Sequence, residues 1–316
     1  MDFPIDLICP WVDGGDPKWR AKKNAALIAA GEKPADNDVS IHRFFDNDEL
    51  KYSLRSVEKF APWIRKIFII TDEQVPEWMN TDNPKIQIVD HAEILPPEAR
   101  PCFNSSTLML NIHKAPGLSK HFLIANDDLF FGRATKPSYF FTKDGTPKLM
   151  LSRRSEQSLA RCDQSYSKVL TNAKKIVRKI CGESHDYDWT PSHNFIPMRK
   201  DIIKKTLAEP EIFDVYKESL MLRFRSPNGL NAGIFSEYAM AKGLVRARIY
   251  GNFKKLLLKL CGKRFPVYDD DARRVLRMWI KPNLFCINDS GLCPEADRRN
   301  REILALMFPE KSEFEK

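Results

Sequence analysis

Two adjacent carboxylates follow an apolar run near the middle of the chain. Phe122 to Ala125 reads Phe-Leu-Ile-Ala and leads directly into Asn126-Asp127-Asp128. Carboxylate oxygens are the ligands that hard cations such as Mg²⁺ or Mn²⁺ prefer, and these cations also bridge phosphate oxygens. An acidic pair at the end of a strand therefore suits the binding of a metal and a phosphorylated ligand. An Asp-rich turn without a ligand has the same composition, and these three residues alone do not separate the two readings.

Phosphoryl transfer is one chemistry that such a metal would support, because it needs positive charge on the transferred group and a positioned nucleophile. One candidate general base is His113 and the other is His193, since imidazole titrates near neutral pH. The nearby cations Arg199 and Lys200 would favour the neutral form of His193. The candidate cations for a phosphate are Arg43, Arg55, Arg199, Lys200, Arg223 and Arg225. Lone histidines and arginines are more often structural, so these roles need further context.

Several common enzyme motifs are missing. The chain contains no GxxxxGK(S/T) phosphate loop, no GxGxxG, no HExxH and no GxSxG. Each of these motifs carries the chemistry of a large enzyme class. Their absence disfavours P-loop kinases, Rossmann dehydrogenases, zinc proteases and α/β-hydrolases.

The composition is that of a folded protein with a basic surface. The chain has 316 residues, of which 43% are hydrophobic, enough to bury a sizeable core. Its formal net charge of +9 would attract nucleotide phosphates, anionic glycans, nucleic acid or an acidic lipid surface. The seven cysteines include no CxxC pair, which favours free thiols in a reducing compartment. No run of about 18 apolar residues occurs and the first residues do not resemble a signal peptide, so we expect a cytoplasmic protein.

The first 150 residues predict a mainly parallel sheet with crossover helices. Four apolar runs are typical of buried strands, and each is followed by a carboxylate. Ligands of open α/β sheets bind at the carboxyl ends of the strands, so we expect these carboxylates near one edge. The strands are 5–12, 67–70, 86–89 and 122–125, and the carboxylates are Asp13, Asp72, Asp90, Asp127 and Asp128.

Helical patterns lie between these strands and dominate the second half. Apolar residues recur at helix spacing in 49–60, 166–180, 234–241 and 294–307. The run 253–265 mixes apolar and basic residues, which is compatible with a packed helix or with peripheral association with a membrane surface.

Four blocks of sequence follow one another and together span most of the chain. They are Ile5–Pro17 with its Trp11-Val12-Asp13-Gly14 turn, residues 43–130 with Phe103-Asn104-Ser105 and Asn126-Asp127-Asp128, residues 193–200 with Arg223-Phe224-Arg225-Ser226, and Phe285-Cys286-Ile287-Asn288-Asp289 with Met307-Phe308-Pro309. In this order the blocks resemble the Stealth family of capsule polysaccharide phosphotransferases, whose relatives include the catalytic subunits of lysosomal-enzyme GlcNAc-1-phosphotransferase. Agreement over four ordered blocks is far more specific than any one motif.

The resemblance implies a Rossmann-like, glycosyltransferase-related fold with helical C-terminal additions. It implies transfer of a sugar-1-phosphate from a UDP-sugar to a glycan hydroxyl, with release of UMP and with Mg²⁺ or Mn²⁺ as cofactor. It assigns Asp128, His193 and Arg225 to catalysis. The implied metal ligands are Asp127, Asp128, Asn288 and Asp289, and the implied donor-binding residues are Asp13, Gly14, Arg55, Asn104, Ser105, Asn126 and Lys200.

Within this family we expect residues 1–150 to form the Rossmann-like part that binds nucleotide-sugar and metal. Residues 151–265 would form a mainly helical insertion that carries His193 and Arg225, and residues 266–316 would close the active site, all within one compact catalytic domain. The chain departs from the family pattern at Met109, where an acidic residue is common, at Cys9-Pro10, and at Asn228-Gly229. These departures bear on the acceptor and on contacts around the site.

Two other functions remain open from the sequence. A conventional metal-dependent glycosyltransferase of similar fold would use the same acidic pair and release UDP. A non-catalytic basic module that binds anions would explain the charge of +9, but strand-end carboxylates would repel nucleic acid in the absence of a metal. The expected partners are therefore a UDP-sugar donor and an oligo- or polysaccharide acceptor, without nucleic acid. The transferred sugar could be GlcNAc, ManNAc or a hexose. The sequence predicts neither the linkage nor the oligomeric state.

Overall fold

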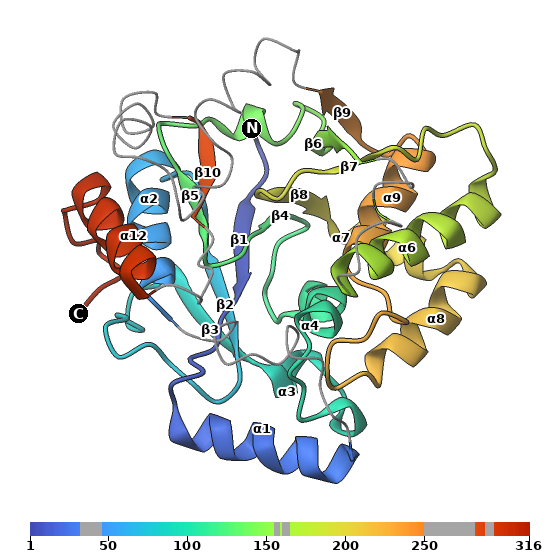
Figure 1. Ribbon diagram of the computed structural model, residues 1–316. Coiled ribbons are helices and arrows are strands. Elements are labelled where there is room, and N and C mark those ends of the chain that lie inside the picture. The colour runs from blue at the N-terminus through green and yellow to red at the C-terminus, as the bar shows by residue number, and fades with distance from the viewer. Residues whose placement is uncertain (32–45, 155–158, 160–164, 250–281, 288–293) are drawn as a thin grey trace.

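The computed structural model describes residues 1–31, 46–154, 159, 165–249, 282–287 and 294–316. A five-stranded sheet in the order β3-β2-β1-β4-β8 lies at its centre (Figure 1). Its strands are β1 (Ile5–Pro10), β2 (Ile67–Thr71), β3 (Ile86–Asp90), β4 (His121–Ile124) and β8 (Ile196–Arg199). The first four run parallel, and β8 runs antiparallel to β4. The expected α/β fold with a mostly parallel sheet is confirmed, and the four predicted strands are its parallel strands.

Two smaller sheets flank this one. Strand β5 (Leu129–Phe131) pairs antiparallel with β10 (Leu284–Cys286). Strand β6 (Lys148–Arg153) lies between β7 (Trp189–Pro191) and β9 (Arg246–Ile249). The β5–β10 pair joins positions more than 150 residues apart, so it brings a late segment of the chain next to the residues that follow β4.

Helices cover the sheet from two sides (Figure 1). Helices α6 to α9 lie together on one side, and α2 and α12 lie together on the other. The α-helices are α1 (Pro17–Ala30), α2 (Glu49–Phe60), α3 (His91–Ile94), α4 (Ser105–Asn111), α6 (Ser165–Cys181), α7 (Lys200–Leu207), α8 (Pro210–Leu220), α9 (Gly233–Ala241) and α12 (Pro294–Met307). Short 3₁₀ turns occupy 97–99, 112–114 and 137–139.

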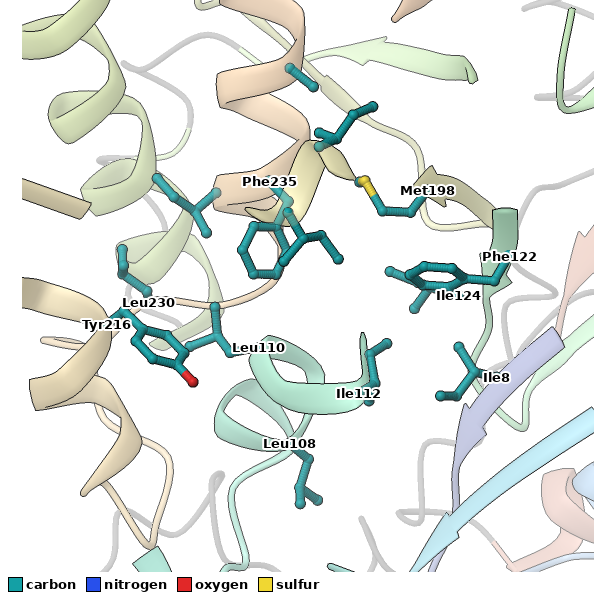
Figure 2. Close-up of a cluster of buried hydrophobic side chains, with 14 of the residues drawn as sticks. Ile8, Leu108, Leu110, Ile112, Phe122, Ile124, Met198, Tyr216, Leu230 and Phe235 are labelled. Carbon is teal, nitrogen blue, oxygen red and sulfur yellow. The ribbon is translucent and has the colours of Figure 1, made fainter. Parts of the chain in front are cut away.

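The two faces of the sheet follow from alternation along its strands, since successive side chains point to opposite faces. Ile8 of β1 and Phe122 and Ile124 of β4 point toward the face that α4 and α9 cover (Figure 2). There they pack with Ile112 and Phe235, and the whole cluster is buried (Figure 2). Leu7 and Cys9 point the other way, toward Leu50 and Leu54 of α2. Burial of apolar surface on both faces holds the strands, and therefore their carboxyl ends, in fixed positions.

Local sequence explains where α1 begins and ends and which face of α2 is buried. Asp16 caps α1 by accepting a hydrogen bond from the backbone N–H of Lys18, and Pro17 occupies the first helical position. Gly31 ends α1 with a φ of 59°, a backbone conformation that favours glycine. Helix α2 buries Leu50, Leu54 and Val57, a stripe at helix spacing that packs on the sheet.

The helices expected at 49–60, 166–180, 234–241 and 294–307 correspond to α2, α6, α9 and α12 within one residue at each end. The run 253–265 lies outside the described residues, so its expected membrane contact stays a prediction. The domain boundaries also stay predictions, although β8 shows that the second segment contributes a strand to the central sheet. Among the helices that the structure describes, none combines the length and the apolar character needed to cross a bilayer.

Candidate active site

The carboxyl ends of the parallel strands meet at one edge of the central sheet. Parallel pairing aligns Ile8 with Ile124, Pro10 with Ile70, and Thr71 with Asp90. The residues that follow these positions therefore leave the sheet on the same side. Asp13, Asp72 and the pair Asp127-Asp128 lie in these exits, and Asp90 is the last residue of β3, as expected from the sequence.

Asp128 lies at the centre of a small group of metal-ligand types. Its Oδ2 is 3.4 Å from Nε2 of His193 and accepts a hydrogen bond from Sγ of Cys286 at 3.1 Å. One ligand atom from each of these three residues lies within 4.8 Å of the others. The second carboxylate oxygen, Oδ1, is buried without a hydrogen-bond partner in the described part of the chain. An orphaned carboxylate oxygen of this kind is suited to a cation.

Pairing between distant strands creates this group. Strand β10 aligns Cys286 with Leu129, the residue after Asp128, and the backbone N–H of Ile287 donates to the carbonyl of Asp128. His193 follows β7, and the backbone N–H of Ser192 donates to the carbonyl of Met150 in β6. Sequence reasoning found Asp128 and His193 but missed Cys286. It lay within a block that matched the family, yet its thiol was read only as one of seven scattered cysteines.

Further carboxyl groups surround the acidic pair. Burial, followed by the charges of Asp128 and Asp46, raises the pKa of Asp127 to about 7. Burial and Asp48 raise the pKa of Asp46 to about 6, and burial and Asp127 raise the pKa of Glu49 to about 8. Asp46 and Glu49 were not predicted as site residues, because they precede and begin a helix in the sequence and only folding brings them to Asp127.

These raised pKa values have a common physical cause. Carboxylates that are buried together cannot all ionise unless positive charge is placed among them. A divalent cation would supply that charge, and oxygen ligands from Asp127 and Asp128 suit Mg²⁺ or Mn²⁺. The residues present therefore fit the expected metal. The other two expected ligands, Asn288 and Asp289, lie outside the described residues and stay predictions.

The turn after β1 borders the acidic group. The Oδ1 of Asp13 accepts a hydrogen bond from the backbone N–H of Gly15 at 2.7 Å, and the charge of Asp13 contributes to the raised pKa of Asp46. The side chain of Gln74, which follows β2, bonds to both the N–H and the carbonyl of Asp13. Gly14 is buried within this turn, and Asn126 opens the turn after β4, where its carbonyl accepts from the N–H of Leu129.

A second group of predicted residues meets at the start of α4. Asn104 caps this helix and donates from Nδ2 to the carbonyls of Leu222 and Phe224, both at 3.1 Å. The guanidinium of Arg225 donates to Oγ of Ser105 at 2.7 Å. Two blocks about 120 residues apart are thereby joined. Asn104 is buried and its amide holds the backbone of the second block, so its position indicates that it orients Arg225.

Two predicted donor-binding residues, Arg55 and Lys200, differ from expectation. Arg55 is held in an ion pair with Glu315, and Lys200 lies away from the acidic pair. Arg55 forms a two-pronged ion pair with Glu315, at 2.8 and 2.7 Å, and also donates to the carbonyl of Phe308. Lys200 follows β8, which runs antiparallel to β4 and aligns Arg199 with His121. Because His121 begins β4 and Asp127 follows its end, Lys200 lies at the opposite edge of the sheet from the acidic pair. The structure does not bring Lys200 into this site.

Fold and site together define an α/β protein with a carboxylate-rich site at the carboxyl edge of its sheet, whose residues would suit a divalent cation. Two family models match the chain, Stealth protein conserved region 1 over residues 3–30 and Stealth protein conserved region 2 over residues 43–149. An exopolysaccharide phosphotransferase of Lactiplantibacillus plantarum, cps2G, is 44% identical, over 99% of this chain and 97% of its own length. The chain belongs to the Stealth family, and the resemblance seen in the sequence is confirmed.

Two further relatives by sequence agree with this assignment. The capsular polysaccharide phosphotransferase fcs1 of Haemophilus influenzae is 35% identical, over 92% of this chain and 79% of its own length. An exopolysaccharide phosphotransferase of Streptomyces coelicolor is 33% identical over 99% of this chain, which spans 57% of that longer relative. Among solved structures, galactosyltransferase LgtC superposes with a TM-score of 0.45 at 11% identity, over 98% of both chains.

Proposed function

We propose that this chain is a polysaccharide phosphotransferase that moves a sugar-1-phosphate from a UDP-sugar to a glycan hydroxyl and releases UMP. The relatives named above are capsular and exopolysaccharide phosphotransferases, which supports this class of reaction. The observation that carries the proposal is the contact between His193 and Asp128 beside a group of uncompensated carboxyl groups. It places a candidate base against a candidate metal ligand.

Each residue then has a defined task. Asp127 and Asp128 would hold Mg²⁺ or Mn²⁺, which neutralises phosphate charge when bound. His193 takes the proton from the acceptor hydroxyl, and the neighbouring carboxylate of Asp128 stabilises the imidazolium that forms. The acceptor oxygen forms a bond to the β-phosphorus, the bond from that phosphorus to the bridging oxygen breaks, and UMP leaves with the bridging oxygen. Arg225, held by Ser105, supplies positive charge for the phosphoryl oxygens.

The donor sugar is an N-acetylhexosamine or a hexose, and the acceptor is an oligosaccharide of capsule or cell-surface type. The reaction would take place in the cytoplasm, with the protein free or at the inner face of the membrane. A basic chain with a net charge of +9 suits both an anionic donor and an anionic surface.

Identification of the released nucleotide tests this proposal. Purified protein is incubated with UDP-GlcNAc, Mg²⁺ and short capsule-type oligosaccharides, followed by a panel of other UDP-sugars. UMP that forms only with metal supports the proposal, whereas UDP would mean a conventional glycosyltransferase, and no nucleotide from any donor in the panel would reject both. Asp128→Asn should abolish the release, and Asp82→Asn, which changes an exposed carboxylate in the loop before β3, is the matched control.

A further inference from the structure

A separate cavity of about 270 Å³ opens at the carboxyl ends of β2 and β3. Its charged lining residues and its histidine are Lys22, Asp72, Glu73, Asp90, His91 and Arg100. None of these residues was assigned a function from the sequence, and only Asp72 and Asp90 were noted as strand-end carboxylates. The cavity lies at the edge where ligands of open α/β sheets bind, but on the other side of β1 from Asp127 and Asp128.

The walls of this cavity carry buried polar atoms that lack a partner. Oδ2 of Asp72, both ring nitrogens of His91 and Nε of Arg100 are buried without a hydrogen bond in the described part of the chain. Asp72 is 6% exposed and His91 is 3% exposed. The nearest approach between these two side chains, from Nδ1 of His91 to Oδ1 of Asp72, is 3.8 Å, too long for a hydrogen bond. Buried polar groups are nearly always paired, so this concentration of orphans at one cavity indicates a polar ligand.

The orphan atoms define which ligand would pair with them. Lys22 binds Oδ1 of Asp72 at 2.7 Å and Oε2 of Glu73 at 3.1 Å, which leaves Oδ2 of Asp72 as an acceptor. Burial lowers the pKa of His91, so its ring is neutral and offers one N–H donor and one acceptor nitrogen. Nε of Arg100 offers a second donor. Two donors and a carboxylate acceptor complement a ring edge that presents two carbonyls on either side of one N–H, which is the edge of uracil.

We propose that this cavity binds the uracil of the donor nucleotide, with Asp72 as acceptor for the ring N–H and His91 and Arg100 as donors to its carbonyls. The proposal rests on the proposed function only in taking the donor to be a UDP-sugar. It assigns to His91 and Arg100 a role in donor recognition, apart from the transfer chemistry at Asp128.

The placement of the cavity matches the length of such a donor. Neighbouring strands lie about 4.8 Å apart, so the edge between β2 and β3 lies roughly 12 Å from the end of β4. The turn after β1 lies between them and is joined to the segment after β2 through Gln74 and Asp13. A nucleoside diphosphate laid across this turn would have its base at His91 and its diphosphate at Asp127 and Asp128.

Binding of UMP to the purified protein, measured by isothermal titration calorimetry in parallel with CMP and GMP, tests the proposal. His91→Phe removes both ring nitrogens at similar size and should weaken UMP binding at least about tenfold. Ala92→Phe enters the cavity from an exposed position and should have the same effect without disturbing the core. The matched control is His121→Phe, a buried imidazole between Phe3 and Phe141 at the amino end of β4, which should leave UMP binding unchanged.

Preference for UMP over CMP and GMP, lost in both His91→Phe and Ala92→Phe, would support the uracil site. Equal binding of the three nucleotides, wild-type UMP affinity in Ala92→Phe, or no binding of UMP to the wild type would overturn it. Failure of the proposed function looks different. A chain that binds UMP through this cavity but releases no UMP from any UDP-sugar would keep the subsite and reject the phosphotransfer, whereas metal-dependent UMP release that is insensitive to both variants would do the reverse.

Discussion

Nε2 of His193 lies 3.4 Å from Oδ2 of Asp128, although the two residues are 65 positions apart in the chain. His193 is about one third exposed and Asp128 is 15% exposed at the side chain, so the pair faces the solvent side of the site rather than the core. This contact joins the residue best suited to take a proton to the residue best suited to hold a metal. The next experiments therefore begin with these two side chains.

Replacement of His193 should remove turnover and leave the fold intact. We expect His193→Ala to lower the rate of UMP release by about 10²- to 10⁴-fold, the usual contribution of a general base. Its melting temperature should stay close to that of the wild type, because the side chain is partly exposed. The rate is measured by nucleotide chromatography at saturating donor. His185→Ala, which removes a half-buried histidine beside Tyr187, is the control, and a His193→Ala enzyme with wild-type rate would exclude a role as base.

Stability of the metal-free protein should fall as the pH rises from about 5 to about 8. The pKa of Glu49 is raised from 4.5 to about 8 and that of Asp127 from 3.8 to about 7. A carboxyl group with a raised pKa in the folded state holds its proton more tightly there than in the unfolded chain. Its contribution is therefore lost progressively as the pH rises from the unfolded pKa through the folded pKa. Thermal melts in EDTA across this range measure the slope.

Glu49→Gln should flatten that slope, because glutamine does not titrate. Mg²⁺ should raise the melting temperature more at about pH 8 than at about pH 6, since ionised carboxylates bind the cation and protonated ones do not. An identical Mg²⁺ shift at both pH values would contradict a site built on these carboxyl groups. Asp128→Asn should reduce the Mg²⁺ shift at either pH.

Periodicity and turn chemistry were sufficient to predict the four parallel strands of the central sheet and the helices α2, α6, α9 and α12, but not strand β8 or the helices α1, α7 and α8. The runs ending at Val12, Ile70, Val89 and Ala125 are short, apolar and followed by polar turns. Such patterns involve only residues that are neighbours in the chain, so the sequence alone displays them. The antiparallel pair β5–β10 was not predicted, because its two strands are three residues each and lie over 150 positions apart. No local pattern records a pairing of that kind.

The candidate site likewise contains some residues that the sequence predicted and others that it did not. Asp127, Asp128 and His193 could be found because residue type and ordered motifs point to their chemistry. Cys286, Asp46 and Glu49 enter the site through tertiary pairing or through burial, neither of which a single sequence displays. Lys200 illustrates the converse, since proximity to His193 in the chain was read as proximity in space, and the antiparallel course of β8 carries it to the opposite edge of the sheet.

Substitution of Arg225 by lysine should show whether turnover depends on the positive charge of this side chain alone or also on its planar guanidinium. Arg225→Lys keeps the positive charge but loses the planar guanidinium that donates to Ser105 at 2.7 Å. We expect turnover to fall by about 10- to 100-fold, with a smaller change in donor KM, because the cation acts on charge that develops during transfer. Steady-state kinetics with a UDP-sugar give both values. Ser105→Ala should show a weaker form of the same defect, and a pure KM effect in both variants would assign Arg225 to donor binding instead.

The family resemblance assigns Arg55 to donor binding, whereas its contacts in the structure indicate a role in stability. A substitution of Arg55 distinguishes these two roles. The Arg55 guanidinium donates one hydrogen bond to each carboxylate oxygen of Glu315, whose side chain is 4% exposed. A third hydrogen bond goes to the carbonyl of Phe308. Arg55→Ala would leave the buried Glu315 carboxylate without its ion-pair partner, although the N–H and hydroxyl of Ser312 still donate to it, and we expect a loss of about 2–4 kcal/mol in the free energy of unfolding. Chemical denaturation measures that loss. Donor KM, determined below the melting transition, should stay within about twofold of the wild type if Arg55 only fastens α2 to the C-terminal segment. A large rise in donor KM with little loss of stability would instead restore Arg55 to the donor pocket.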